Sequence, residues 1–108
     1  MGQSLGELEQ LILLALLRLG DEGFGAGVQR EIEERADRRV ALGGVYTALM
    51  RLESKGYVVS REGAPTAQRG GRRRRLYRVT PHGQRALASA IGAIRSMARG
   101  ITPRLELP

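Results

Sequence analysis

The first apolar pattern in the chain predicts a helix over residues 5–19 that is apolar on almost every side. Ser4 and Glu7 have the spacing of a capping box, which would start the helix at this point. The apolar residues in this stretch are Leu8, Leu11, Ile12, Leu14, Ala15, Leu16 and Leu19. One small domain cannot cover every side of such a helix, so part of it is expected to meet a second subunit. A fully buried central helix is the alternative that this pattern leaves open.

Two further helices are predicted, over residues 25–36 and over about residues 43–55. The later one stops at Gly56, a residue suited to the left-handed conformation that often follows a helix. Its apolar residues fall at i, i+3, i+4 and i+7 and form one stripe: Val45, Ala48, Leu49 and Leu52. Its opposite arc carries Gly44, Thr47, Arg51, Ser54 and Lys55. Small side chains near the start and cations further along suit a helix that enters the major groove of DNA, although an ordinary surface helix has the same pattern.

The second half of the chain changes to a strand pattern and then returns to a helix. Residues 57–61 and 75–79 have strand composition, and residues 62–71 have the composition of a loop, so a long-looped hairpin is predicted. Thr80 and Pro81 are typical of the N-cap and the first position of a helix. The apolar stripe of this last helix comprises Leu87, Ile91, Ile94 and Ala98, broadened by Ala90 and Met97. From Gly100 onward we expect a flexible tail.

The positive charge is concentrated in the predicted hairpin. The chain has 18 Lys and Arg against 11 Asp and Glu, for a net charge of +7. Residues 61–78 hold seven arginines against one glutamate, a balance of +6. Four of these arginines are consecutive: Arg72, Arg73, Arg74 and Arg75. Such a patch is typical of proteins that bind polyanions, and a solvated basic loop is the plainer interpretation.

The order of the elements favours the nucleic-acid interpretation. Three helices followed by a two-stranded hairpin is the order of a winged helix-turn-helix, a mainly α fold with a small β-hairpin called the wing. The arginines fall on the wing, where that architecture contacts phosphate. The prediction is therefore a winged helix-turn-helix DNA-binding domain over residues 1–80, a C-terminal dimerisation helix over 81–100 and a tail over 101–108.

Several motifs resemble the PadR family of transcriptional regulators, specifically its short members with a single C-terminal helix. The resemblance covers about residues 5–95. It begins with Leu5-Gly6-Glu7-Leu8-Glu9 and the leucine-rich first helix, and continues with Gly25 at the start of the second. It includes Gly43-Gly44-Val45-Tyr46-Thr47-Ala48-Leu49 with Arg51-Leu52-Glu53-Ser54-Lys55-Gly56, and then Arg69-Gly70-Gly71-Arg72 and Tyr77-Arg78-Val79-Thr80-Pro81-His82-Gly83.

This resemblance implies a homodimeric repressor that binds pseudo-palindromic double-stranded DNA, with the last helix packed against the first helix of the partner. The implied base-reading residues are Gly44, Thr47 and Arg51. The implied phosphate contacts are Tyr46, Lys55, Arg72, Arg73, Arg74 and Arg75. The expected dimer interface comprises Leu8, Leu11, Ile12, Leu87, Ile91, Ile94 and Met97. Larger members carry a longer, multi-helix C-terminal region, and this chain has room for one helix. A small-molecule effector is possible, but the sequence gives no support for one.

The sequence argues against an enzyme, a metal site or a cofactor. There is no cysteine, and His82 is the single histidine, predicted to be a surface or capping residue. No phosphate-binding loop of the GxxxxGK[ST] kind occurs. The longest apolar run, residues 11–17, is too short to cross a membrane, so a soluble cytoplasmic protein is expected. A protein-interaction module and a non-specific or RNA-binding protein remain as alternatives, although four aromatic residues offer little base stacking.

Overall fold

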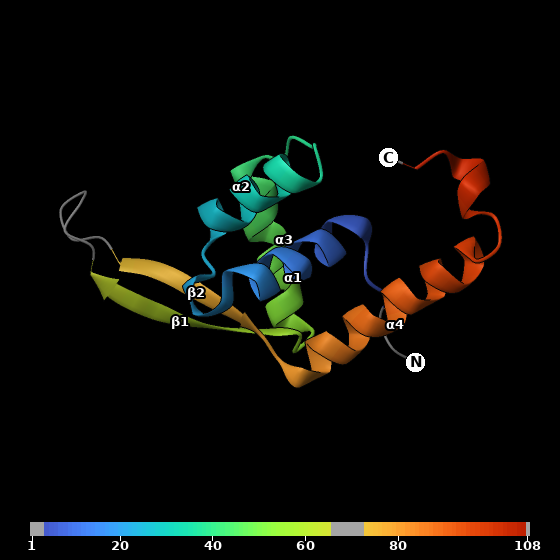
Figure 1. Ribbon diagram of the computed structural model, residues 1–108. Coiled ribbons are helices and arrows are strands. Elements are labelled where there is room, and N and C mark those ends of the chain that lie inside the picture. Colours follow the sequence, from blue (N-terminus) through green and yellow to red (C-terminus); the bar gives the residue numbers. More distant parts are fainter. Residues whose placement is uncertain (1–3, 66–72, 108) are drawn as a thin grey trace.

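The computed structural model describes residues 4–65 and 73–107. The elements are α1 (Glu7–Leu19), the 3-10 helix η1 (Gly20–Glu22), α2 (Gly25–Arg35), α3 (Leu42–Ser54), β1 (Val58–Pro65), β2 (Arg73–Val79), α4 (Pro81–Ala98) and the 3-10 helix η3 (Thr102–Leu105). Helices α1 to α3 cluster together, the hairpin extends from one side of the cluster, and α4 leaves on the other side (Figure 1). The molecule is therefore elongated, with extents of 53 × 33 × 21 Å. This arrangement confirms the predicted fold class.

The core lies where α1, α2 and α3 meet each other and the base of the hairpin. All four residues of the apolar stripe predicted for α3 are at most 2% exposed. The rest of the core comprises Ile12, Leu13, Ala15, Leu16, Val28, Ile32, Tyr57, Val58, Tyr77 and Leu87. Because one face of α3 is fixed in this core, its opposite face is held in a defined orientation toward solvent.

Helix α1 begins two residues later than predicted, and the predicted capping pair is wrong. The N-cap is Gly6, whose backbone N–H donates to Glu9 Oε1 at 2.9 Å. Glu7, the residue expected to reach back to Ser4, instead forms an exposed ion pair with Arg38. Ser4 to Glu7 and Gly6 to Glu9 have the same spacing. The carboxylate of Glu9, which caps the helix, also has a cationic partner, which is described below.

The hairpin is longer than its composition predicted. The strands are antiparallel, with Val58 opposite Val79 and Glu62 opposite Arg75. The pairing continues past an irregularity to Pro65, in a stretch expected to be loop because of its glycine and proline. The rest of the predicted loop, residues 66–71, lies outside the described part of the chain. Within the predicted flexible tail, the structure places the short 3-10 helix η3.

The segment that follows η1 holds the hairpin against the helices. The backbone N–H of Tyr77 in β2 donates to the carbonyl of Gly23 at 2.6 Å. A Cβ atom at Gly23 would lie 2.7 Å from both Leu16 Cδ2 and the carbonyl oxygen of Tyr77, so this close approach requires glycine. The hairpin is thereby positioned relative to α1 and α2.

A second set of contacts joins the end of α3 to the start of α4. Thr80 Oγ1 accepts from the backbone N–H of Gly83 at 3.0 Å, which confirms the predicted N-cap, and donates to the carbonyl of Gly56 at 2.7 Å. The backbone N–H of Thr80 donates to the carbonyl of Tyr57 at 3.0 Å. The exposed His82 ring lies 4.8 Å from the ring of Tyr57.

Within the described residues, no helix is both long and apolar enough to span a membrane.

Candidate nucleic-acid interface

The outward face of α3 contains all three residues predicted to read bases. Gly44, Thr47 and Arg51 are exposed. A Cβ atom at Gly44 would meet no heavy atom within 4 Å, so the surface there is open. Thr47 Oγ1 donates to the carbonyl of Gly43 at 3.0 Å, which holds its side chain against the start of the helix. The surface therefore has little bulk near the N-terminus of α3 and carries a cation about two turns later.

Tyr46 lies on the flank of α3 that faces the start of α2. A Cβ atom at Gly25 would lie 2.5 Å from Cζ of the Tyr46 ring, so the ring packs directly on this glycine. The side chain is still 39% exposed. Tyr46 therefore fixes the distance between α2 and α3 while it keeps an accessible edge.

Lys55, which was predicted to hold phosphate, is paired with a carboxylate of the protein itself. Its Nζ lies 2.8 Å and 3.1 Å from the two carboxylate oxygens of Glu9, and the two side chains are only 15% and 7% exposed. On the helical wheel Lys55 lies beside the buried stripe of α3, where α1 approaches. The lysine therefore neutralises a buried carboxylate inside the protein.

The Glu9–Lys55 pair sets the ionisation of Glu9. Burial raises the pKa of the Glu9 carboxyl, but the hydrogen bonds from Lys55 and from the Gly6 backbone outweigh it, and the pKa is lowered overall. A carboxyl whose folded pKa is lowered adds stability at neutral pH. That stability is lost as the pH falls through the folded pKa, below about 4.5.

Replacement of Lys55 by alanine is therefore expected to lower the free energy of unfolding by about 3 kcal/mol at pH 7, because Glu9 would be left buried and unpaired. The difference from the unsubstituted protein should shrink at pH 4, where Glu9 takes up a proton in the variant. Urea unfolding at both pH values measures this. Arg38→Ala, which removes only the exposed pair with Glu7, is the control and should change little. Equal stability of Lys55→Ala and the unsubstituted protein at pH 7 would contradict the pairing.

The described part of the wing carries exposed cations on β2. The guanidinium of Arg74 lies 4.3 Å from the centroid of the Phe24 ring, a cation–π contact that holds it near the start of α2. Arg74 and Arg75 are both exposed. Arg72 lies outside the described residues, and so does the side chain of Arg73. Two of the four predicted wing arginines are thus placed on the surface of β2.

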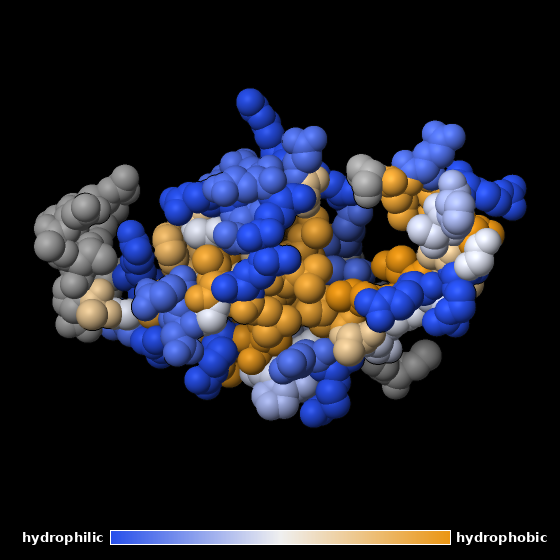
Figure 2. Space-filling view, viewed as in Figure 1, coloured by the Kyte–Doolittle hydropathy of each residue, from blue (hydrophilic) through white to orange (hydrophobic). Residues whose placement is uncertain are grey.

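A separate apolar surface is formed by α1 and α4. Ile94 and Met97, both predicted interface residues, are 60% and 80% exposed on α4. Leu14 and Leu17 on α1, which are not among the predicted interface residues, are 38% and 44% exposed. Figure 2 shows apolar side chains gathered between the helical cluster and α4. Such a surface is unusual for a chain that functions alone.

The remaining predicted interface residues divide into two groups. Leu8, Leu11 and Ile91 are partly buried and border the exposed surface. Ile12 and Leu87 are 0% and 3% exposed within the protomer, so their assignment to a dimer interface is corrected. Their side chains pack in the protomer's own core and offer no surface to a partner.

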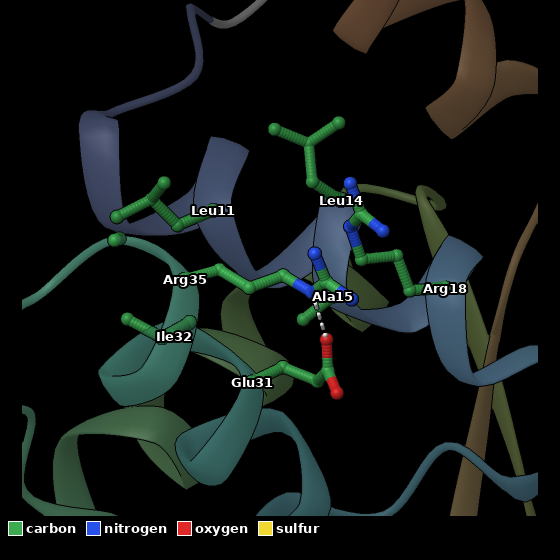
Figure 3. Close-up of a pocket in the computed structure, with 8 residues that line it drawn as sticks. Leu11, Leu14, Ala15, Arg18, Glu31, Ile32 and Arg35 are labelled. Atoms are coloured by element: carbon green, nitrogen blue, oxygen red, sulfur yellow. Dashed lines mark hydrogen bonds and ion pairs between the residues drawn. The ribbon is translucent and has the colours of Figure 1, made fainter. Parts of the chain in front are cut away.

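A groove of about 320 Å³ lies between α1 and α2, beside the exposed leucines. Leu11 and Ile32 form part of its apolar lining (Figure 3). The Arg35–Glu31 ion pair, at 2.9 Å, and Arg18 form its polar rim. In Figure 3 Leu14 points away from α2, on the open side of α1.

No group of three or more residues suited to hold a metal occurs in the described ranges.

The helical cluster, the outward face of α3 and the basic hairpin define a winged helix-turn-helix transcriptional regulator. The chain belongs to the transcriptional regulator PadR-like family, whose family model matches residues 13–89. The resemblance found in the sequence is therefore confirmed. The family consists of transcriptional regulators, which confirms the prediction of a regulator rather than an enzyme.

Individual relatives agree with this assignment. The chain is 37% identical over 81 residues to the transcriptional regulator Rv3488 of Mycobacterium tuberculosis, covering 75% of this chain and 71% of that protein. A crystal structure of a PadR family transcription regulator from Clostridium difficile matches with a TM-score of 0.75 and 27% identity, covering 93% of this chain and 99% of the other. Bacillus subtilis PadR, solved in complex with operator DNA, shares the fold, with a TM-score of 0.64, 22% identity and coverage of 78% and 47%.

Proposed function

We propose that this protein is a homodimeric repressor that binds a pseudo-palindromic operator sequence-specifically. In this proposal α3 enters the major groove, and the arginines of the wing contact the phosphate backbone. Gly44, Thr47 and Arg51 face base edges, and Tyr46 contacts phosphate beside them. A twofold dimer presents two such helices, which accounts for the expected symmetry of the operator.

The observation that carries the proposal is the outward face of α3. A helix with four buried residues on one side and small, polar and cationic residues on the other is positioned rigidly and is open enough to approach base edges. Arg74 and Arg75 add positive charge on β2 of the wing. The Bacillus subtilis neighbour, which has the same fold, was solved in complex with operator DNA, and this supports DNA binding as the function.

The apolar surface on α1 and α4 supports dimerisation. Ile94 and Met97 on α4 would cover Leu14 and Leu17 on α1 of a partner, and the twofold relation would repeat the contact. The groove between α1 and α2 lies beside these leucines, so the partner's α4 would also cover part of it. Burial of large apolar side chains provides the free energy for such association.

Replacement of Arg51 by alanine tests the base-reading role. If the guanidinium makes a bidentate contact with guanine, operator binding should weaken by about 1–3 kcal/mol, with less loss on scrambled duplex. Fluorescence anisotropy with a duplex selected from a random pool measures both affinities. Arg95→Ala removes one exposed charge from α4, far from α3, and should preserve the ratio of the two affinities. An equal loss on operator and scrambled DNA for Arg51→Ala would reject the assignment.

A further inference from the structure

Met50 is a long apolar side chain at the centre of the outward face of α3. It is 68% exposed, compared with 39% for Tyr46 and 37% for Leu42 on the same helix. It belongs neither to the apolar stripe nor to the polar arc that the sequence predicts for this helix. Its exposure means that it contributes little to the core, so stability does not require an apolar residue at this position.

The neighbours of Met50 make it the protruding residue of this face. At 100° per residue, Gly43, Thr47, Met50 and Ser54 fall on one ridge, directly opposite the buried stripe. The other three are small, and Thr47 is held back by its hydrogen bond to Gly43. Met50 therefore extends furthest from the helix axis along this ridge. Arg51 lies beside the ridge.

The ridge does not belong to the apolar surface of α1 and α4. The buried stripe of α3 packs toward α1, α2 and the hairpin. The ridge, on the other side of the helix, is consequently turned away from them. A dimer formed through α1 and α4 would leave Met50 uncovered and available to a different partner.

We propose that Met50 is a specificity-determining residue that contacts the C5-methyl group of a thymine in each half of the operator. This inference rests on the proposed function. The thymine methyl is the apolar group that base pairs present in the major groove, and it is therefore the feature that an apolar side chain can recognise there. The unbranched, flexible thioether of methionine adapts to such a contact. Thr47 and Arg51 supply the hydrogen-bonding groups beside it.

The test uses the full chain and a duplex selected from a random pool, in which each thymine is replaced in turn by deoxyuridine. This change deletes the methyl group and keeps every base-edge hydrogen-bonding group. The unsubstituted protein should lose about fourfold in affinity at one symmetric pair of positions, the value of one buried methyl group per site. Met50→Ala should bind the thymine and uracil duplexes equally, and Met50→Leu should retain the preference. Circular dichroism should show both variants folded, because the side chain is exposed.

The outcomes separate this inference from the proposed function. If the unsubstituted protein prefers its selected duplex but is indifferent to every methyl group, the inference is wrong and the proposed function stands. The same holds if Met50→Ala keeps the full methyl preference. If the unsubstituted protein does not distinguish selected from scrambled duplex, the proposed function fails and the inference fails with it.

Discussion

Replacement of Ile94 by aspartate is expected to leave the chain monomeric and to weaken operator binding by at least about a hundredfold. Ile94 is 60% exposed in the protomer, so the substitution should leave the core intact. In the proposed dimer the new aspartate carboxylate would be buried against the apolar residues of α1, with no cation or hydrogen-bond donor beside it. Burial of such an unpaired charge is strongly unfavourable. Each monomer would then hold a single reading helix, and binding through two linked half-sites would be lost.

Analytical ultracentrifugation and anisotropy measure the two effects together. Ser96→Asp is the matched control, because it introduces the same charge into the same helix. Ser96 is exposed on the opposite side of α4 from Ile94. It should remain dimeric and bind the operator normally. A dimer of unchanged stability in Ile94→Asp would reject the proposed interface.

Gly83→Ala is expected to destabilise the folded chain strongly. A Cβ atom at Gly83 would lie 2.1 Å from the carbonyl oxygen of Tyr57 and 2.9 Å from its carbonyl carbon. Both obstacles are backbone atoms, so α4 and the start of β1 would have to separate. That movement would also strain the bonds through which Thr80 joins α4 to the end of α3. We expect the free energy of unfolding to fall by about 3 kcal/mol, measured by urea unfolding at fixed protein concentration.

Gly92→Ala provides the control for this prediction. Gly92 lies in the same helix, and a Cβ atom there would meet no heavy atom within 4 Å. Alanine favours helix over glycine, so this variant should be more stable by about 0.5–1 kcal/mol. Destabilisation by both substitutions, to the same extent, would mean that the contact with Tyr57 is not the cause.

The sequence predicts the fold well because its elements carry independent local signals. Thr80 and Pro81 mark the start of α4, and the stripe of α3 has an unambiguous helical period. Helix α1 is different, because apolar residues surround it and the period does not say which side enters the core. Ile12 was therefore expected at the surface although it is buried, and the exposure of Leu14 and Leu17 was not predicted. Leu11, Leu14 and Arg18 are spaced at i, i+3 and i+7 and so share one face of α1. Only the packing shows that this face borders a groove and is not buried in the core.

The site is less predictable because its residues depend on partners that are distant in sequence. Lys55 pairs with Glu9, 46 residues earlier. Nothing near Lys55 in the sequence indicates that its ammonium group lies beside a buried carboxylate. The role of Glu9 as the helix cap was missed for the same reason. Gly83 is part of a motif in the sequence, yet its requirement for glycine arises from the backbone of Tyr57, which lies across the hairpin. Packing, rather than local pattern, decides these three positions.

The most direct test of sequence-specific binding compares two affinities by fluorescence anisotropy across a salt series. One is the affinity of the protein for the DNA immediately upstream of its own gene, and the other is its affinity for a scrambled duplex. A dimeric, base-reading regulator should prefer the upstream DNA by about a hundredfold or more, and the preference should persist as salt rises. Equal binding to both duplexes, falling steeply with salt, would contradict sequence-specific regulation and leave a non-specific basic protein. No binding to either duplex would favour a protein-interaction module.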